Sequence, residues 1–312
     1  MQRRDAFTLI ELIFVIVIMG ILAKFGIDLL AQGYRNYLAT TLNASLQAKS
    51  EMAIEIIASR LQYRIKPSVI ARKEGGDLND FDALASSNYD DNATILEWIG
   101  VDMDGFRGGG SSGYVLPYWS GVIDLRHPQT TPLQLKSPKT NTTRIDDLVS
   151  VLSYGKSDFN DTALFFIGAN SNIKTGYGWD GTALRDQNGS MHPVGRDPNN
   201  EDLFIPINGE SGEPNSFDGV DVYEFYQLAW SAYAVEINKS NNDLILHYNY
   251  QPWRGENYKE DSQSHIIMHN VSSFRFKEIG SVIKLQVCVK SAIIDGINDA
   301  EGYSLCKEKT VF

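Results

Sequence analysis

The chain has 312 residues, of which 43% are hydrophobic and 21% are charged. This length is enough for at least one substantial globular domain with its own hydrophobic core. Lysine and arginine total 28 against 39 aspartate and glutamate residues, so the formal net charge is −11 at pH 7. This acidic balance argues against nucleic acid or an anionic membrane surface as the main partner of the chain beyond its N-terminal segment.

The first apolar stretch covers residues 7–23 and contains one charged residue, Glu11. Extended to residue 31, it is long enough for a membrane-spanning helix. Arg3 and Arg4 precede it, so the positive-inside rule predicts a cytoplasmic start and an exported remainder. A buried core helix and an ordinary secretory signal are the alternatives. Against the signal, Glu11 interrupts the apolar region and no small-x-small cleavage site follows Ala23.

Residues 6–12 have the sequence AFTLIEL, and Gly20 follows within the same apolar stretch. This motif resembles the N-terminus of type IV pilins and type II secretion pseudopilins. In that family a membrane-embedded aspartyl prepilin peptidase cleaves before the phenylalanine and methylates the new amino terminus. The resemblance therefore implies cleavage between Ala6 and Phe7 and methylation of the Phe7 nitrogen, although the family usually has glycine where this chain has Ala6.

Glu11 is a carboxylate within a segment expected to lie in hydrocarbon, where an unpaired charge costs several kcal/mol. The resemblance implies that Glu11 pairs with the methylated Phe7 amine of a neighbouring subunit and so sets the register of a helical filament. The alternative is a glutamate at the headgroup boundary, which needs no partner.

The helical pattern continues past the membrane stretch, because apolar residues recur at steps of three or four until Pro67. The apolar positions are Leu42, Leu46, Ala53, Ile54, Ile57, Leu61 and Ile65. The pattern predicts one helix over residues 7–66, about 90 Å long. Residues 7–30 form its membrane-spanning half and residues 31–66 its amphipathic half.

We expect residues 67–312 to form an exported globular domain. Its first part, 67–220, is rich in turn residues and contains a short apolar segment at 94–99. We expect a short helix at 145–152 and strands at 119–125, 163–168 and 203–207. Its last part, 221–312, predicts an antiparallel meander with a hairpin (228–237 and 244–250) and strands at 274–277 and 283–290. The expected fold class is α+β and pilin-like: a long N-terminal helix packed on an antiparallel sheet, with long loop insertions.

The two cysteines, Cys288 and Cys306, both lie near the C-terminus. In an exported protein an isolated pair is most simply a disulfide. A loop of this size would contribute about 3 kcal/mol of stability through the unfolded state.

No combination of residues predicts catalysis or a cofactor. Residues 108–113 match two glycine-rich catalytic patterns, but Pro117 follows where both patterns need a helix. His265 and His269 have the spacing of a helical zinc pair, but Ile266 stands where a metalloprotease needs glutamate. The acidic tracts complete no Ca²⁺ loop. We therefore predict no enzyme, no cofactor and no metal site.

Four Asn-x-Ser/Thr sites carry an acidic residue two positions before the asparagine. They are Asn92, Asn160, Asn188 and Asn238. This extended pattern resembles the acceptor of bacterial oligosaccharyltransferases, so glycosylation of these four is a hypothesis. The alternative is that loops rich in Asn, Asp and Ser produce the pattern.

The first functional hypothesis is a structural minor pilin or minor pseudopilin of a type IV pilus or a type II secretion pseudopilus. Its partners would be the prepilin peptidase, other pilins or pseudopilins, and the inner membrane, with the C-terminal domain in the periplasm before assembly. The second hypothesis is a tip adhesin whose loops at 68–143 and 170–220 contact a surface ligand. The third, a membrane-anchored exported enzyme, has no set of catalytic residues behind it.

Overall fold

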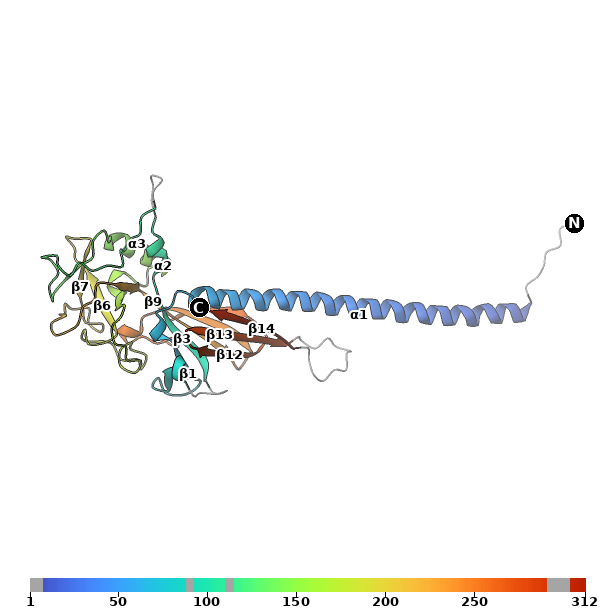
Figure 1. The fold of residues 1–312 in the computed structure, drawn as a ribbon. Coiled ribbons are helices and arrows are strands. Elements are labelled where there is room, and N and C mark those ends of the chain that lie inside the picture. Colours follow the sequence, from blue (N-terminus) through green and yellow to red (C-terminus); the bar gives the residue numbers. More distant parts are fainter. Residues whose placement is uncertain (1–7, 88–92, 110–114, 291–303) are drawn as a thin grey trace. The chain divides into compact units, whose positions relative to one another are not determined.

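The computed structural model describes residues 8–87, 93–109, 115–290 and 304–312. It divides into two compact units, residues 1–49 and residues 50–312. A long N-terminal helix is followed by three antiparallel sheets, which is the α+β, pilin-like class that the sequence predicts (Figure 1).

Helix α1 (Leu9–Leu61) has no proline along its length and is continuous across both units. It ends before the predicted Lys66 because the next residues pair with a strand. Ile65 N–H donates to the Ile99 carbonyl (2.9 Å), and Tyr63 accepts from Val101 N–H (2.8 Å). These bonds replace helical ones, and a 3-10 turn, η1 (Lys66–Ser68), follows with Pro67 in its first turn.

The first sheet has six strands in the order β11-β10-β9-β3-β1-β2. They are β1 (Ile70–Lys73), β2 (Phe81–Ala83), β3 (Ala93–Gly100), β9 (Ser231–Asn238), β10 (Asp243–Tyr250) and β11 (Gln263–Met268). The predicted hairpin is confirmed as β9–β10, but its first strand begins at Ser231 rather than at residue 228, because Tyr226–Ala229 forms strand β8 of another sheet. Strand β3, which pairs with β9, comes from the region expected to be loop-rich and carries Ile95, Leu96, Trp98 and Ile99, all fully buried. The loop-rich region therefore supplies part of the core.

The second sheet has five short strands in the order β4-β7-β6-β5-β8. They are β4 (Leu135–Lys136), β5 (Ala163–Phe166), β6 (Met191–Arg196), β7 (Leu203–Pro206) and β8 (Tyr226–Ala229). Helix α3 (Thr142–Leu152) buries Ile145 and Val149 in the same core cluster as Phe166 and Phe204. The predicted strand at 119–125 is wrong: it forms only an isolated bridge, Val122 with Phe225, although Trp119 and Ile123 are buried.

The third sheet has the order β12-β13-β14, with β12 (Val271–Ile279), β13 (Val282–Lys290) and β14 (Ser304–Val311). The two predicted strands at 274–277 and 283–290 are confirmed as an antiparallel pair. They do not continue the β9–β10 hairpin as one meander, however. The chain leaves β11 through Asn270, which has a positive φ of 59°, and this turn starts a separate sheet.

Short elements join these layers. They are helix α2 (Met103–Arg107) and the 3-10 turns η2 (Leu84–Ser86), η3 (Phe159–Asp161) and η4 (Pro252–Arg254). The central core cluster contains residues of the six-stranded and five-stranded sheets together, including Ile99, Ala163, Met191 and Ala232. Residues 50–312 therefore share a core that joins these two sheets.

Candidate functional site

The start of α1 is built by Thr8 and Glu11. The Glu11 carboxylate accepts hydrogen bonds through Oε2 from Thr8 N–H (2.9 Å) and from the Thr8 hydroxyl (2.8 Å). The Thr-x-x-Glu spacing is that of a capping box, which satisfies donors at the start of a helix. Within the described residues Oε1 of Glu11 has no hydrogen bond, so the carboxylate can accept from one further partner. Ala6 and Phe7, the predicted cleavage site, lie outside the described residues.

The first half of α1 presents apolar side chains to its surroundings. Leu9, Phe14 and Ile27 are 77%, 63% and 66% exposed. By length and composition, α1 is the single helix in the described part of the chain that could cross a membrane, with a mean hydropathy of 2.5 in its most apolar window. The surface of this segment is therefore suited to lipid or to apolar neighbours.

The last turns of α1 belong to the second unit and bind its C-terminal strand. Lys307 Nζ lies 3.4 Å from Glu51 Oε2, and Lys309 makes a similar ion pair with Glu55. Buried Arg64 donates to the Phe312 carbonyl (3.2 Å). The predicted apolar stripe is buried at Ala53, Ile54, Ile57, Leu61 and Ile65, whereas Leu42 is 36% exposed. The helix is thus fixed to the domain from about Ser50 onward.

Cys288 of β13 and Cys306 of β14 form the predicted disulfide. The two residues are directly opposite each other in the strand register. The bond attaches the last strand to its neighbour beside the segment 291–303, which lies outside the described residues.

Asp102 lines a cavity of about 370 Å³ together with Arg60, Arg107, Trp230 and Tyr233. Its Oδ1 caps α2 by accepting from Gly105 N–H (3.0 Å). Its Oδ2 is buried without a hydrogen-bond partner among the described residues. Burial raises the pKa of Asp102 to about 6. The cavity therefore contains a carboxyl group that changes charge near neutral pH.

A serine, a histidine and a glutamate meet on the six-stranded sheet. His247 Nδ1 lies 2.9 Å from Ser262 Oγ, and its Nε2 lies 3.2 Å from Glu236 Oε1. In the serine hydrolases the nucleophile meets Nε2 and the acid meets Nδ1, which is the reverse arrangement. The Ser262 hydroxyl also donates to the Tyr258 carbonyl. These contacts tie β9 and β10 to the residue that precedes β11.

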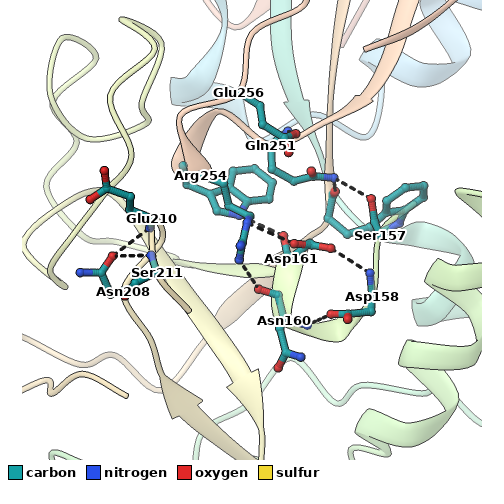
Figure 2. A network of polar contacts seen from close by, with 12 residues as sticks. Ser157, Asp158, Asn160, Asp161, Asn208, Glu210, Ser211, Gln251, Arg254 and Glu256 are labelled. Atoms are coloured by element: carbon teal, nitrogen blue, oxygen red, sulfur yellow. Dashed lines mark hydrogen bonds and ion pairs between the residues drawn. The ribbon is translucent and has the colours of Figure 1, made fainter. Parts of the chain in front are cut away.

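A polar network joins the turns η3 and η4 (Figure 2). Arg254 Nε pairs with Asp161 Oδ1 (3.1 Å), and Arg254 Nη1 donates to the Asn160 carbonyl (3.1 Å). Asp158 and Asp161 cap η3 reciprocally, and Trp253 Nε1 donates to the Asp161 carbonyl (3.0 Å). Burial raises the pKa of Asp161. Each of these groups contacts another member of the network. Together these contacts hold in place the turn that carries Asn160.

The predicted glycosylation sites differ in the accessibility of their hydroxyl residues. Asn160 is exposed, but its Thr162 is fully buried. Asn188 is exposed, but its Ser190 is 3% exposed and accepts from Asn172 N–H. The Asn238 site lies in the turn between β9 and β10, and its Ser240 is exposed. Asn92 lies outside the described residues.

The histidine pair does not form a zinc site. His265 lies on β11 and His269 just beyond it, so four residues of extended chain separate them by about 13 Å. His269 instead contacts Asp243 Oδ1 (2.6 Å). Across the described ranges, no group of three or more His, Cys, Asp or Glu side chains is arranged to hold a metal ion.

Two functional features were not predicted from the sequence. The role of Thr8 could have been found, because Thr8 and Glu11 have capping-box spacing just before an apolar run. The buried Asp102, whose Oδ2 has no hydrogen-bond partner among the described residues, could not have been found, because its burial depends on Trp119 and Trp230 packing from distant segments.

Comparisons with known proteins concern the N-terminal segment. A family model described as the prokaryotic N-terminal methylation motif matches residues 1–23. Searches of curated proteins and of solved structures found no significant match. The matched segment includes the capped start of α1 and the first part of its apolar surface, and this family is structural rather than enzymatic. The match over residues 1–23 supports a relationship to type IV pilins and pseudopilins, which are substrates of prepilin peptidase.

Proposed function

We propose that the chain is a minor pilin or minor pseudopilin of a type IV pilus or a type II secretion pseudopilus. The observation that carries the proposal is the matched methylation motif at the start of one uninterrupted helix with exposed apolar residues. Residues 1–6 are then a leader, residues 7–30 span the inner membrane once, and residues 31–66 connect to a periplasmic domain at 67–312.

Prepilin peptidase would cleave between Ala6 and Phe7 and methylate the Phe7 amine. Co-expression with that peptidase, followed by mass spectrometry, should give a chain that starts at singly methylated Phe7. Ala6→Gly, which restores the family's usual residue, should be cleaved at least as well. A mature N-terminus after Ala23, or at Met1, would overturn the assignment.

Filament entry would depend on Glu11. Its carboxylate keeps Oε1 available beyond the Thr8 cap, which suits a contact with the methylated amine of a neighbouring subunit. Glu11→Ala should still be cleaved but should be depleted from purified filaments. Glu51→Ala is the matched control, because it removes a carboxylate of the same helix that forms only a partly exposed ion pair. Equal incorporation of the two variants would contradict the pairing.

The size of the domain favours a subunit present in few copies. A body formed by residues 50–312 would crowd a filament in which every subunit repeats at close axial spacing. An alternative function is a tip adhesin that uses the segments 68–143 and 170–220. Deleting them is a poor test, because they contain core residues such as Trp98, Trp119 and Phe204. Substituting exposed residues is the better approach.

A further inference from the structure

A groove of about 690 Å³ opens along one side of strand β12. Six consecutive residues of β12, 272–277, line it. Its opposite wall comes from the six-stranded sheet and η2, with Ala71, Leu84 and Thr94. Side chains of both orientations in β12 line the groove, and so do Lys284 and Gln286 of β13 and Glu308 of β14. The groove therefore runs along the edge of β12 and continues over the face that carries these polar side chains.

The outer edge of β12 has unpaired backbone groups. Cys288 and Cys306 are directly opposite with Cα atoms 4.0 Å apart, which marks a pair without mutual backbone hydrogen bonds. The backbone groups of Cys288 therefore point to its β12 partner, Ser273. Because the direction of the backbone groups alternates along a strand, the N–H and C=O groups of Phe274, Phe276 and Glu278 point away from β13, toward the free edge. Within the described ranges no backbone hydrogen bond engages them.

One face of this edge carries an excess of positive charge. Lys277 and Lys284 are exposed and directly opposite each other on β12 and β13. Like charges in that position repel, and neither lysine has an ion pair with a described residue. Arg275 and Gln286 are directly opposite each other on the same face, and Gln286 Nε2 donates to Glu308 Oε1 of β14 (2.7 Å). The excess of positive charge therefore rests on the two lysines. In a chain of net charge −11, this face would attract acidic side chains.

The other face of β12 is apolar. Phe274 and Phe276 have ring centroids 5.2 Å apart, and Phe276 is only half-buried. A strand placed against this edge would therefore meet apolar surface on one face and lysine on the other. An extended segment that alternates acidic and apolar residues is the complementary occupant.

We propose that the outer edge of β12 binds such a segment of a partner protein by strand addition, with Lys277 and Lys284 selecting its acidic side chains. This goes beyond the proposed function and does not depend on filament assembly. The competing interpretation is that the lysines only protect an edge strand from aggregation, which is a common role of edge lysines.

The test uses the full chain in a non-ionic detergent and a short fluorescein-labelled peptide that alternates glutamate with valine. Fluorescence anisotropy should show saturable binding, and the matching lysine–valine peptide should not bind. Hydrogen–deuterium exchange should slow at the amides of Phe276 and Glu278 when the peptide is bound. Absence of binding, or binding without this protection, would overturn strand addition.

Charge reversal tests the two lysines. Lys277→Glu with Lys284→Glu should weaken peptide binding by at least about tenfold. Lys156→Glu with Lys259→Glu makes the same change in net charge away from the groove and should leave binding unchanged. If the two double variants bind the peptide equally well, Lys277 and Lys284 do not select its acidic side chains. Melting curves would verify that all variants are folded.

Discussion

Arg72 and Glu97 form an ion pair between β1 and β3 whose side chains are only 3% and 1% exposed. Arg72 also donates to the Trp179 carbonyl (2.8 Å), and Tyr250 donates its hydroxyl proton to Glu97 Oε2 (3.1 Å). Burial raises the pKa of Tyr250, and the neighbouring Glu97 carboxylate raises it further. The pair thereby joins four segments of the chain: β1, β3, the loop that carries Trp179, and β10.

Breaking this pair should be costly. Glu97→Gln leaves the Arg72 guanidinium buried without a counter-ion, and we expect a loss of about 3–5 kcal/mol in the free energy of unfolding. Replacing both residues, Arg72→Met with Glu97→Leu, should lose less than the sum of the single variants, because no charge is left unpaired. Denaturant unfolding of the full chain in detergent gives these values. Additive losses would show that the two charges act independently.

Asp102 should make stability depend on pH. Its pKa is raised from 3.8 to about 6 by burial, so the folded protein binds this proton more tightly than the unfolded chain. The contribution is therefore fully present below about pH 4 and is lost as the pH rises through about 6, with a total of about 3 kcal/mol.

The variant Asp102→Asn isolates this effect, because an amide oxygen can still accept from Gly105 N–H and does not titrate. Relative to wild type, the variant should gain stability between pH 4 and pH 7. Asp218→Asn is the control: it removes an exposed carboxylate that is not among the groups acting on Asp102, and it should track wild type. Parallel stability curves for wild type and Asp102→Asn would contradict the burial argument.

The disulfide should stabilise the C-terminal strand. Cys288 and Cys306 are separated by 18 positions, and closing a loop of that length contributes about 3 kcal/mol in the chain-entropy model. Cys288→Ser with Cys306→Ser should lower the free energy of unfolding by that order, and reduction of wild type should have the same effect. If reduction leaves the unfolding midpoint unchanged, the bond is not a stabilising one.

Among the described acid-extended sites, Asn238 should be the preferred glycosylation acceptor. Its Ser240 is exposed in a hairpin turn, whereas Thr162 and Ser190 of the other two sites are buried. Co-expression with a bacterial oligosaccharyltransferase should add glycan mass that Asn238→Gln removes and Asn160→Gln retains. An unchanged intact mass would show that none of these sites is glycosylated. Glycan at Asn160 would show that burial of the hydroxyl residue does not prevent glycosylation.

Local patterns predicted many elements of the fold. The hairpin across residues 238–243 and the strands around Phe274 and Leu285 follow from period-two alternation. The strand predicted at 119–125 failed because Trp119 and Ile123 are buried by packing rather than by strand pairing. Alternation also could not show that β12 leaves the hairpin sheet, since this is decided by the turn at Asn270.

The functional features also divide into those that local sequence predicted and those that only the tertiary structure brought together. The N-terminal motif and the cysteine pair each depend on a few residues, so residue types and spacing were sufficient to predict the matched motif and the disulfide. Cleavage after Ala6 and the pairing of Glu11 stay predictions. The Asp102 cavity, the His247 contacts and the groove along β12 each combine residues from several distant segments. No local pattern contains that information.

The sequence by itself determined the N-terminal motif, the apolar helix and the antiparallel character of the domain, because these depend on residue type at fixed local spacing. Only the tertiary structure decided where the helix ends, how the strands divide among three sheets and which charges are buried. These depend on backbone pairing and desolvation between distant segments, as when Ile65 leaves the helix to pair with Ile99.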